Sequence, residues 1–297
     1  MVKWQGRQGS SNIEDRRGQG GGFRGSNPFG TGGGGFRLPS GRSGGGMGSI
    51  AVIIIFIVIA MAFGINPLSI LTGDTSTNAP FQQKQPPVSA DEDELAQFVS
   101  VMVQDTEDYW TRYFRSQGET YTPPKIVLFS GQTESACGVA DTSSGPFYCP
   151  NDRKVYLDLA FYDQLRNDLG APGDFAQAYV IAHEVGHHVQ NLIGVLPEFN
   201  QRRQTMSQEE ANAASVKVEL QADCFAGAWG KGEFEQGYLD ATDVSEALKA
   251  ANQIGDDRLT GGRIPPTQYT HGTSEQRVKW FRQGYESGDP SRCDTGA

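Results

Sequence analysis

Histidine and cysteine are scarce in this sequence, with four of each among 297 residues. The cysteines, at positions 137, 149, 224 and 293, lack the short spacing of structural zinc sites, so a zinc-finger type of protein is excluded. Basic residues are also outnumbered, with 25 Lys and Arg against 35 Asp and Glu. Because a nucleic-acid-binding protein needs a basic face to neutralise phosphates, we expect no nucleic-acid partner.

Glycine and positive charge are concentrated at the start of the chain. Residues 1–48 hold 17 of the 38 glycines and seven Lys and Arg against two acids, and the rest of the chain is strongly acidic. Few of these 48 residues are apolar, so burial could not offset the entropy lost on ordering them. The composition therefore predicts a disordered, Gly-rich basic arm over residues 1–48.

Long hydrophobic runs are absent except for one. Residues 50–63 are all apolar, and no charge occurs between Arg42 and Asp74. This length predicts a transmembrane signal anchor over residues 49–71, which contacts the lipid bilayer. The alternative is a cleavable signal peptide, but the preceding region is far longer than a normal signal peptide allows. Since Lys and Arg precede the span, we expect the arm to be cytoplasmic and the remainder outside.

The rest of the chain divides into a flexible, Pro-rich linker over residues 72–90 and one domain over residues 91–297. Periodicity in this domain predicts a mostly helical α+β fold with short strands. The expected helices cover residues 91–116, 174–195, 208–230, 243–255 and 274–288, and the expected strands cover residues 125–130 and 153–159.

An even number of cysteines in a domain outside the membrane predicts two disulfides. A Cys137–Cys149 bond would close a short loop, which leaves Cys224–Cys293 to tie the C-terminal segment to a helix. Four cysteines allow three pairings, so this pairing is a hypothesis. The alternative is four buried thiols.

Three of the four histidines lie in AHEVGHH, residues 182–188. On a helix, His183 and His187 project from one face one turn apart, a spacing at which two imidazoles bind one Zn²⁺. Glu184 lies between them and can accept a proton from a metal-bound water. Gly186 allows close approach of another backbone or a substrate. His188 should point away from the metal. A helix with this pair and no metal is the alternative.

A second pair of candidate residues, Glu219 and Asp223, lies four positions apart on an otherwise apolar helix. A buried carboxylate pair without a cation would be costly. We therefore expect Glu219 to be the third zinc ligand and Asp223 to accept the free N–H of a ligating histidine. The alternative is a solvated acidic edge.

The remaining histidine, His271, precedes Arg277 by six residues near the C-terminus. A His or Arg beside a metal can stabilise the oxyanion that forms when water attacks a carbonyl. A single histidine in a loop is more often simply solvated, so these residues alone are a weak signal.

HEVGH (183–187), ELQAD (219–223) and THGTSEQR (270–277) together resemble the motifs of gluzincin-type metallopeptidases. The second and third are similar to those of the membrane-bound peptidases of the prenyl-protein and stress-protease group. In that group the downstream His and the Arg six positions later contact substrate near the zinc, which implies this role for His271 and Arg277. The chain departs from the group's pattern at Gly272, where Pro is usual.

Nearly the whole chain resembles the bacterial putative neutral zinc metallopeptidase family. The resemblance rests on WQGRQGSSNIEDRRG (4–18), the Gly-rich arm, the single apolar segment, FYCPNDRKVYLDL (147–159) and HEVGHHVQ (183–190). It implies a zincin-like fold and a single-pass protein of the bacterial inner membrane. The N-terminus would be cytoplasmic and the C-terminal domain periplasmic or otherwise extracytoplasmic. It implies no particular substrate.

The expected activity is hydrolysis of peptide bonds in a protein or peptide substrate. Zn²⁺ held by His183, His187 and Glu219 would keep a fourth position for water, with Glu184 as general base. An extended substrate would pair with the edge of the sheet that contains residues 153–159. The alternatives are a non-proteolytic, zinc-stabilised binding or adaptor protein of the envelope and a zinc hydrolase with another substrate. Glu184 favours the peptidase, since a scaffold needs no general base.

Overall fold

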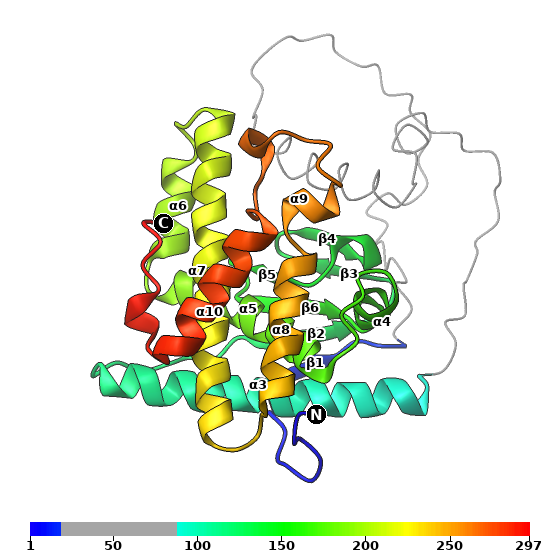
Figure 1. Ribbon diagram of the computed structural model, residues 1–297. Coiled ribbons are helices and arrows are strands. Elements are labelled where there is room, and N and C mark those ends of the chain that lie inside the picture. The colour runs from blue at the N-terminus through cyan, green and yellow to red at the C-terminus, as the bar shows by residue number, and fades with distance from the viewer. Residues whose placement is uncertain (19–87) are drawn as a thin grey trace, which may run out of the picture. The chain divides into compact units, whose positions relative to one another are not determined.

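The computed structural model describes residues 1–18 and 88–297, which form one compact unit (Figure 1). Its α-helices are α3 (Ala90–Ser116), α4 (Ala160–Asn167), α5 (Asp174–Leu192), α6 (Val195–Arg202), α7 (Gln208–Glu235), α8 (Ala241–Gln253), α9 (Asp256–Leu259) and α10 (Ser274–Ser287). Its strands are β1 (Ile13–Asp15), β2 (Lys125–Phe129), β3 (Gln132–Ser135), β4 (Gly138–Asp141), β5 (Phe147–Cys149) and β6 (Lys154–Asp158). Short 3₁₀ turns cover Thr142–Ser144, Pro266–Gln268 and Pro290–Arg292. The predicted mostly helical α+β fold is confirmed.

The main sheet has the strand order β1-β2-β6-β5. Strands β1, β2 and β6 are parallel, and β5 runs antiparallel to β6. Ile126 and Leu128 of β2 face the large helical core, whereas Val127 and Phe129 form a smaller cluster with Ala140 of the β3–β4 hairpin. Strand β6 therefore lies inside the sheet, and the outer strands of this sheet within the described residues are β1 and β5. The expectation that a substrate pairs with an edge of the sheet that contains residues 153–159 stays a prediction.

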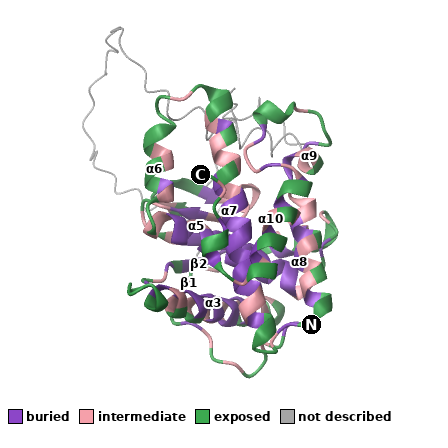
Figure 2. Ribbon diagram, turned by 60° about the vertical axis from the view of Figure 1, so that its left-hand side comes forward, coloured by how far each residue is buried: buried purple, intermediate pink, exposed green. Residues whose placement is uncertain are grey.

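Helix α5 lies at the centre of the molecule, where the buried residues concentrate (Figure 2). It contacts α7 and α8 on one side and strands β5 and β6 on another. A helix enclosed on most sides must be apolar around most of its circumference, and α5 is so from Phe175 to Val189. Any polar side chain on α5 is consequently held in a low-dielectric setting with few water molecules.

Helix α7 lies alongside both α5 and α10. It begins with a capping box in which Ser207 and Glu210 satisfy each other's backbone N–H groups. Its contact with α10 is close and requires glycine at position 284. A Cβ atom there would lie 1.9 Å from the carbonyl oxygen of Cys224. This close packing brings the segment that follows α10 against the middle of α7.

Both disulfides form as predicted. Cys137–Cys149 joins the β3–β4 hairpin to β5, and Cys224–Cys293 joins α7 to the segment after α10. The first closes 12 residues of sequence and the second closes 69. The second bond therefore fixes a contact between elements that are distant in the sequence.

Residues 1–18 are not a disordered arm. Strand β1 pairs with β2, Arg7 forms a two-pronged ion pair with the buried Asp105 of α3, and Asn12 donates to Glu107. The prediction for this segment is wrong because its polar side chains, which composition alone assigns to solvent, have specific partners on the domain. The remainder of the predicted arm, the expected span at 49–71 and most of the linker lie outside the described residues.

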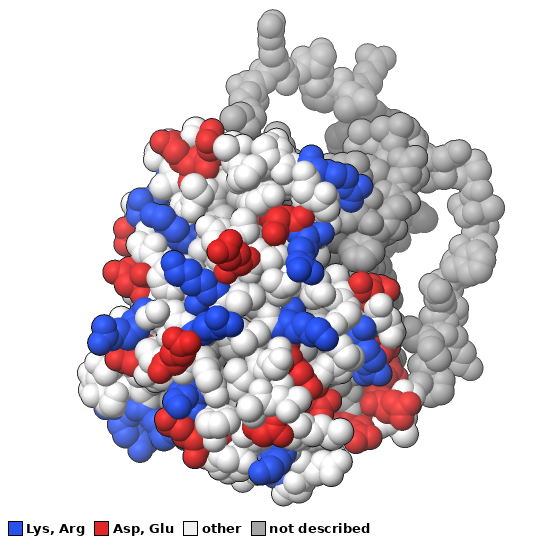
Figure 3. All heavy atoms as spheres, viewed as in Figure 1, with Lys and Arg blue, Asp and Glu red and all other residues white. Residues whose placement is uncertain are grey.

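None of the helices in the described residues is long and apolar enough to cross a bilayer. On the face drawn in Figure 3, basic and acidic side chains are interspersed, so this face has no continuous basic surface. The expectations about membrane and nucleic-acid partners stay predictions.

A buried acidic pair beneath the N-terminal segment should make stability depend on pH. Burial raises the pKa of Asp105, and burial together with the neighbouring Asp105 raises the pKa of Glu233 to about 8, from an ordinary 4.5. Between about pH 4.5 and 8 the folded state therefore keeps a proton that the unfolded state releases. The free energy of unfolding falls as the pH rises across this range, and the contribution is lost once the pH has passed through 8.

Glu233→Gln should remove this loss and raise the free energy of unfolding at pH 9 by about 1–3 kcal/mol, since each pKa unit corresponds to about 1.4 kcal/mol. Urea unfolding of the full-length chain at several pH values measures it. Glu235→Gln, at an exposed position of the same helix, is the matched control and should follow the unmodified protein. A Glu233→Gln protein with the unmodified protein's pH profile would contradict the assignment.

Candidate metal centre

The HEVGH residues lie in the buried middle of α5. His183 and Glu184 are 6% and 7% exposed, and the ring centroids of His183 and His187 are 4.7 Å apart. Because they are one helical turn apart, both imidazoles project toward α7. The predicted helical placement of this motif is confirmed.

Glu219 of α7 meets both rings. One carboxylate oxygen lies 3.2 Å from Nε2 of His183, and the other lies 3.5 Å from Nε2 of His187. The helices can approach this closely because residue 186 is glycine: a Cβ atom there would lie 3.2 Å from the backbone of Ala222. Gly186 therefore serves the contact between α5 and α7, one of the two uses expected for it.

These three side chains form a donor set that suits Zn²⁺. One ligand atom from each of His183, His187 and Glu219 lies within 4.8 Å of the other two. Two neutral imidazole nitrogens and a carboxylate oxygen are the ligands of many catalytic zinc sites, which keep a fourth position open. The residues therefore fit the ion that the sequence predicts.

The opposite nitrogen of each imidazole is also held. Nδ1 of His183 lies 2.9 Å from Asp223, and Nδ1 of His187 lies 2.8 Å from the side-chain oxygen of Gln190. Donation from Nδ1 to these oxygens leaves each Nε2 to face the common point beside Glu219. Asp223 has its predicted place, whereas Gln190 was not identified from the sequence.

Arg277 does not face an open site. It is 3% exposed, and its Nε and Nη2 atoms each lie 2.9 Å from the Asp223 carboxylate. Tyr179 donates a 2.5 Å hydrogen bond to the same carboxylate. With its guanidinium engaged in this way, Arg277 holds Asp223 in place, and the expected catalytic role for Arg277 stays a prediction.

The charges of the site favour a bound cation. Burial alone would lower the pKa of His183, but hydrogen bonds to Asp223 and Glu219 raise it to about 9. Burial alone would raise the pKa of Glu219, but His187 and His183 hold it well below its usual range. A divalent cation bound here would therefore displace a proton from His183 and replace its positive charge.

Glu184 differs from the two neighbouring acids in its contacts. It is 7% exposed, and no hydrogen bond or ion pair engages its carboxylate among the described residues. The neighbouring Glu219 and Asp223 are both held by several partners. Among the described residues, the Glu184 carboxylate is therefore not taken up by a structural contact.

His271 lies close enough to Glu219 for each to shift the other's pKa. Its Nδ1 lies 3.1 Å from Asp256, whose other oxygen accepts the backbone N–H groups of residues 270–272. Gly272 in this turn has φ +85°, a left-handed conformation that proline cannot adopt. This explains the glycine at this position, and Asp256 is a residue that the sequence did not reveal.

His188 points away from the ligands, as expected. Its two nitrogens lie 3.0 Å from the hydroxyl of Tyr148 and 2.7 Å from the carbonyl of Thr122. Burial lowers its pKa to about 4, so it is a neutral histidine that ties α5 to β5 and to the loop before β2.

Comparison with known proteins identifies the family of this chain. The model of the family described as "Putative neutral zinc metallopeptidase" matches residues 2–296. The chain belongs to this family. The match includes the N-terminal segment as well as the domain that carries the candidate metal ligands.

Two relatives illustrate the family. The chain is 48% identical to "Uncharacterized protein YpfJ" of Escherichia coli K12 over 297 residues, which cover 99% of this chain and 98% of that protein. It is 45% identical to "Uncharacterized protein Mb2605" of Mycobacterium bovis over 189 residues, which cover 59% of this chain and 63% of that protein. No solved structure matches significantly.

Glu219→Ala should abolish zinc binding, because two histidines alone would hold the ion weakly. Elemental analysis of the purified full-length protein after dialysis measures the bound metal. Glu209→Ala, at an exposed position in the first turn of the same helix, should keep the zinc content of the unmodified protein. An unchanged zinc content in Glu219→Ala would place the third ligand elsewhere.

Proposed function

We propose that this protein is a zinc-dependent peptidase with a zincin-like catalytic domain. The observation that supports it most is the convergence of His183, His187 and Glu219 next to Glu184, an acid that no other described residue engages. A purely structural zinc site would need a fourth protein ligand and no free carboxylate.

Zinc held by these residues would polarise the scissile carbonyl and increase the acidity of an attacking water. Glu184 accepts the proton of that water and then passes it to the leaving amine. The two neighbouring acids have other partners, because Glu219 would bind the cation and Asp223 is hydrogen-bonded to His183. Glu184 is therefore the acid that remains to act as the base.

His271 would donate a hydrogen bond to the developing oxyanion, a role that a positioned histidine can fill. Burial alone would lower its pKa, but the neighbouring Asp256 and Glu219 raise it. Asp256 holds Nδ1 and the backbone of the turn, which keeps the ring in one orientation.

An extended peptide would bind along β5 rather than β6. Within the described residues β5 is the last strand of the sheet on the side next to α5, whereas β6 is paired on both edges. Strand addition to β5 would bring a peptide bond toward the ligand-bearing face of α5. The two disulfides favour an oxidising compartment for this domain, in agreement with an envelope substrate.

Glu184→Gln should keep zinc but lower peptide turnover by at least ~10²-fold, because proton transfer by a positioned base contributes about 10²–10⁴-fold. Turnover of a peptide library by the full-length protein, with a chelator control, measures it. Glu198→Gln, at an exposed position on α6, is the matched control. Unimpaired turnover in a zinc-replete Glu184→Gln protein would remove Glu184 from the base role. A zinc-replete unmodified protein without turnover would favour the adaptor alternative.

A further inference from the structure

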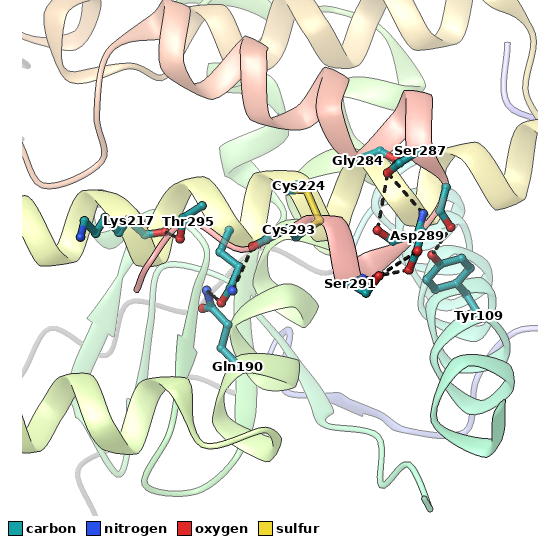
Figure 4. The surroundings of a disulfide bond; sticks show 12 residues. Tyr109, Gln190, Lys217, Cys224, Gly284, Ser287, Asp289, Ser291, Cys293 and Thr295 are labelled. Atoms are coloured by element: carbon teal, nitrogen blue, oxygen red, sulfur yellow. Dashed lines mark hydrogen bonds between the residues drawn. A yellow bond between two sulfur atoms is a disulfide. The ribbon is translucent and has the colours of Figure 1, made fainter. Parts of the chain in front are cut away.

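A chain of buried side chains leads from a metal-ligand residue to a disulfide. The Gln190 amide, whose oxygen faces His187, donates from its nitrogen to Gln221, 3.0 Å away, and to the carbonyl of Val218, 2.7 Å away. Gln221 in turn donates to the carbonyl of Cys293, 3.0 Å away (Figure 4). Gln190 is fully buried and Gln221 is 8% exposed, so water cannot easily replace these partners.

The last partner in this chain is held covalently. Cys293 belongs to the short segment after α10, and its disulfide to Cys224 fixes it against α7 (Figure 4). Apart from this bond and the Gln221 contact, the hydrogen bonds between the segment and α7 are those of Lys217 with Gly296 and Thr295, which are open to solvent. Without the disulfide, the Cys293 carbonyl would depend on these weaker contacts.

The orientation of the Gln190 amide matters for the metal site. Its nitrogen has two acceptors, so its oxygen is the atom that faces His187. If Gln221 lost the Cys293 carbonyl, it would be free to turn and offer its own nitrogen to Gln190. A Gln190 amide that rotated to accept this nitrogen would give up its hydrogen bond to the Val218 carbonyl and point N–H groups at Nδ1 of His187. The ring could then no longer keep Nε2 free for the cation.

We propose that the Cys224–Cys293 disulfide sets the zinc affinity of the site through Gln221 and Gln190, which are positioning residues for His187. This rests on the proposed zinc peptidase function and adds a form of regulation to it. The site reaches full affinity only after the disulfide has formed. The protein would therefore bind zinc weakly in a reducing compartment and tightly in an oxidising one.

The test compares two disulfide-free variants of the full-length protein. Cys224→Ser/Cys293→Ser should bind zinc about 10–100-fold more weakly in chelator competition, which is the usual effect of losing a partner of a metal-ligating histidine. Cys137→Ser/Cys149→Ser is the matched control and should stay within about threefold of the unmodified protein. Unchanged affinity in the first variant, or equal losses in both, would overturn the proposal.

A second variant keeps the test informative if the first does not fold. Gln221→Met retains the disulfide but removes the link, and it should also weaken zinc binding about tenfold or more and alter the absorption spectrum of bound Co²⁺. Combined with Cys224→Ser/Cys293→Ser, it should cause little additional loss, since both act through one path. Additive losses would contradict the path. Because the readout is metal binding, a protein that binds zinc without cleaving peptides would refute only the peptidase function.

A separate observation concerns the membrane topology. Residues 1–18 are part of the folded domain through β1 and through the ion pair of Arg7 with Asp105. If the intervening chain crossed a bilayer once, these residues and the domain would be on opposite sides and the contacts could not form. We infer that residues 1–18 and residues 88–297 lie on the same side of any membrane that the chain meets.

Cysteine labelling of the full-length protein in intact bacterial cells tests this inference. Gln5→Cys in the N-terminal segment and Glu198→Cys on α6 place thiols at exposed positions of the two parts. A membrane-impermeant maleimide should either label both before permeabilisation or label both only afterwards. Labelling of one in intact cells and of the other only after permeabilisation would overturn the inference.

Discussion

The close contact between α5 and α7 is the constraint on which the candidate site depends. Two imidazoles on one helix supply two ligand nitrogens. A complete cation site forms only when a carboxylate from another element lies close to both. The missing side chain at Gly186 lets the backbone of α7 approach near Ala222, and this places Glu219 against both Nε2 atoms. A larger residue at position 186 would separate the helices, so the glycine is as necessary to the geometry as the ligands are.

Because this contact lies in the protein interior, the carboxylates near it are shielded from water and need partners among the surrounding residues. Asp223 is buried and Glu219, one helical turn away, is largely shielded from solvent, and unpaired charges at such positions would be strongly destabilising. Arg277 and Tyr179 hold Asp223, while Glu219 lies against the imidazoles of His183 and His187. Arg277 thus contributes to the site by fixing the acid that orients His183.

The sequence identified the three candidate ligands because helical geometry converts a spacing of four residues into a shared face. It could not reveal Gln190, Tyr179 or Asp256, since ordinary residue types acquire such roles only through tertiary packing. Strand β1 was missed for a related reason: three residues carry little periodic signal, and their partners in β2 lie more than one hundred residues away. The interior position of β6 also follows from that long-range pairing and not from its own sequence.

Long-range contacts also connect the site with the segment after α10, whose structure could not be predicted from its composition. The segment after α10 is short and mostly irregular, yet its carbonyl at Cys293 ends the hydrogen-bonded chain that begins at His187. A hydrogen bond to a mobile carbonyl could not orient a buried amide, because the entropy of fixing that segment would offset the gain. Covalent attachment to α7 already restricts the segment, so the hydrogen bond to Cys293 costs little further conformational entropy. In the proposed path the disulfide therefore contributes to the geometry of the candidate metal centre, although no hydrogen bond joins either cysteine to His183, His187 or Glu219 in the described residues.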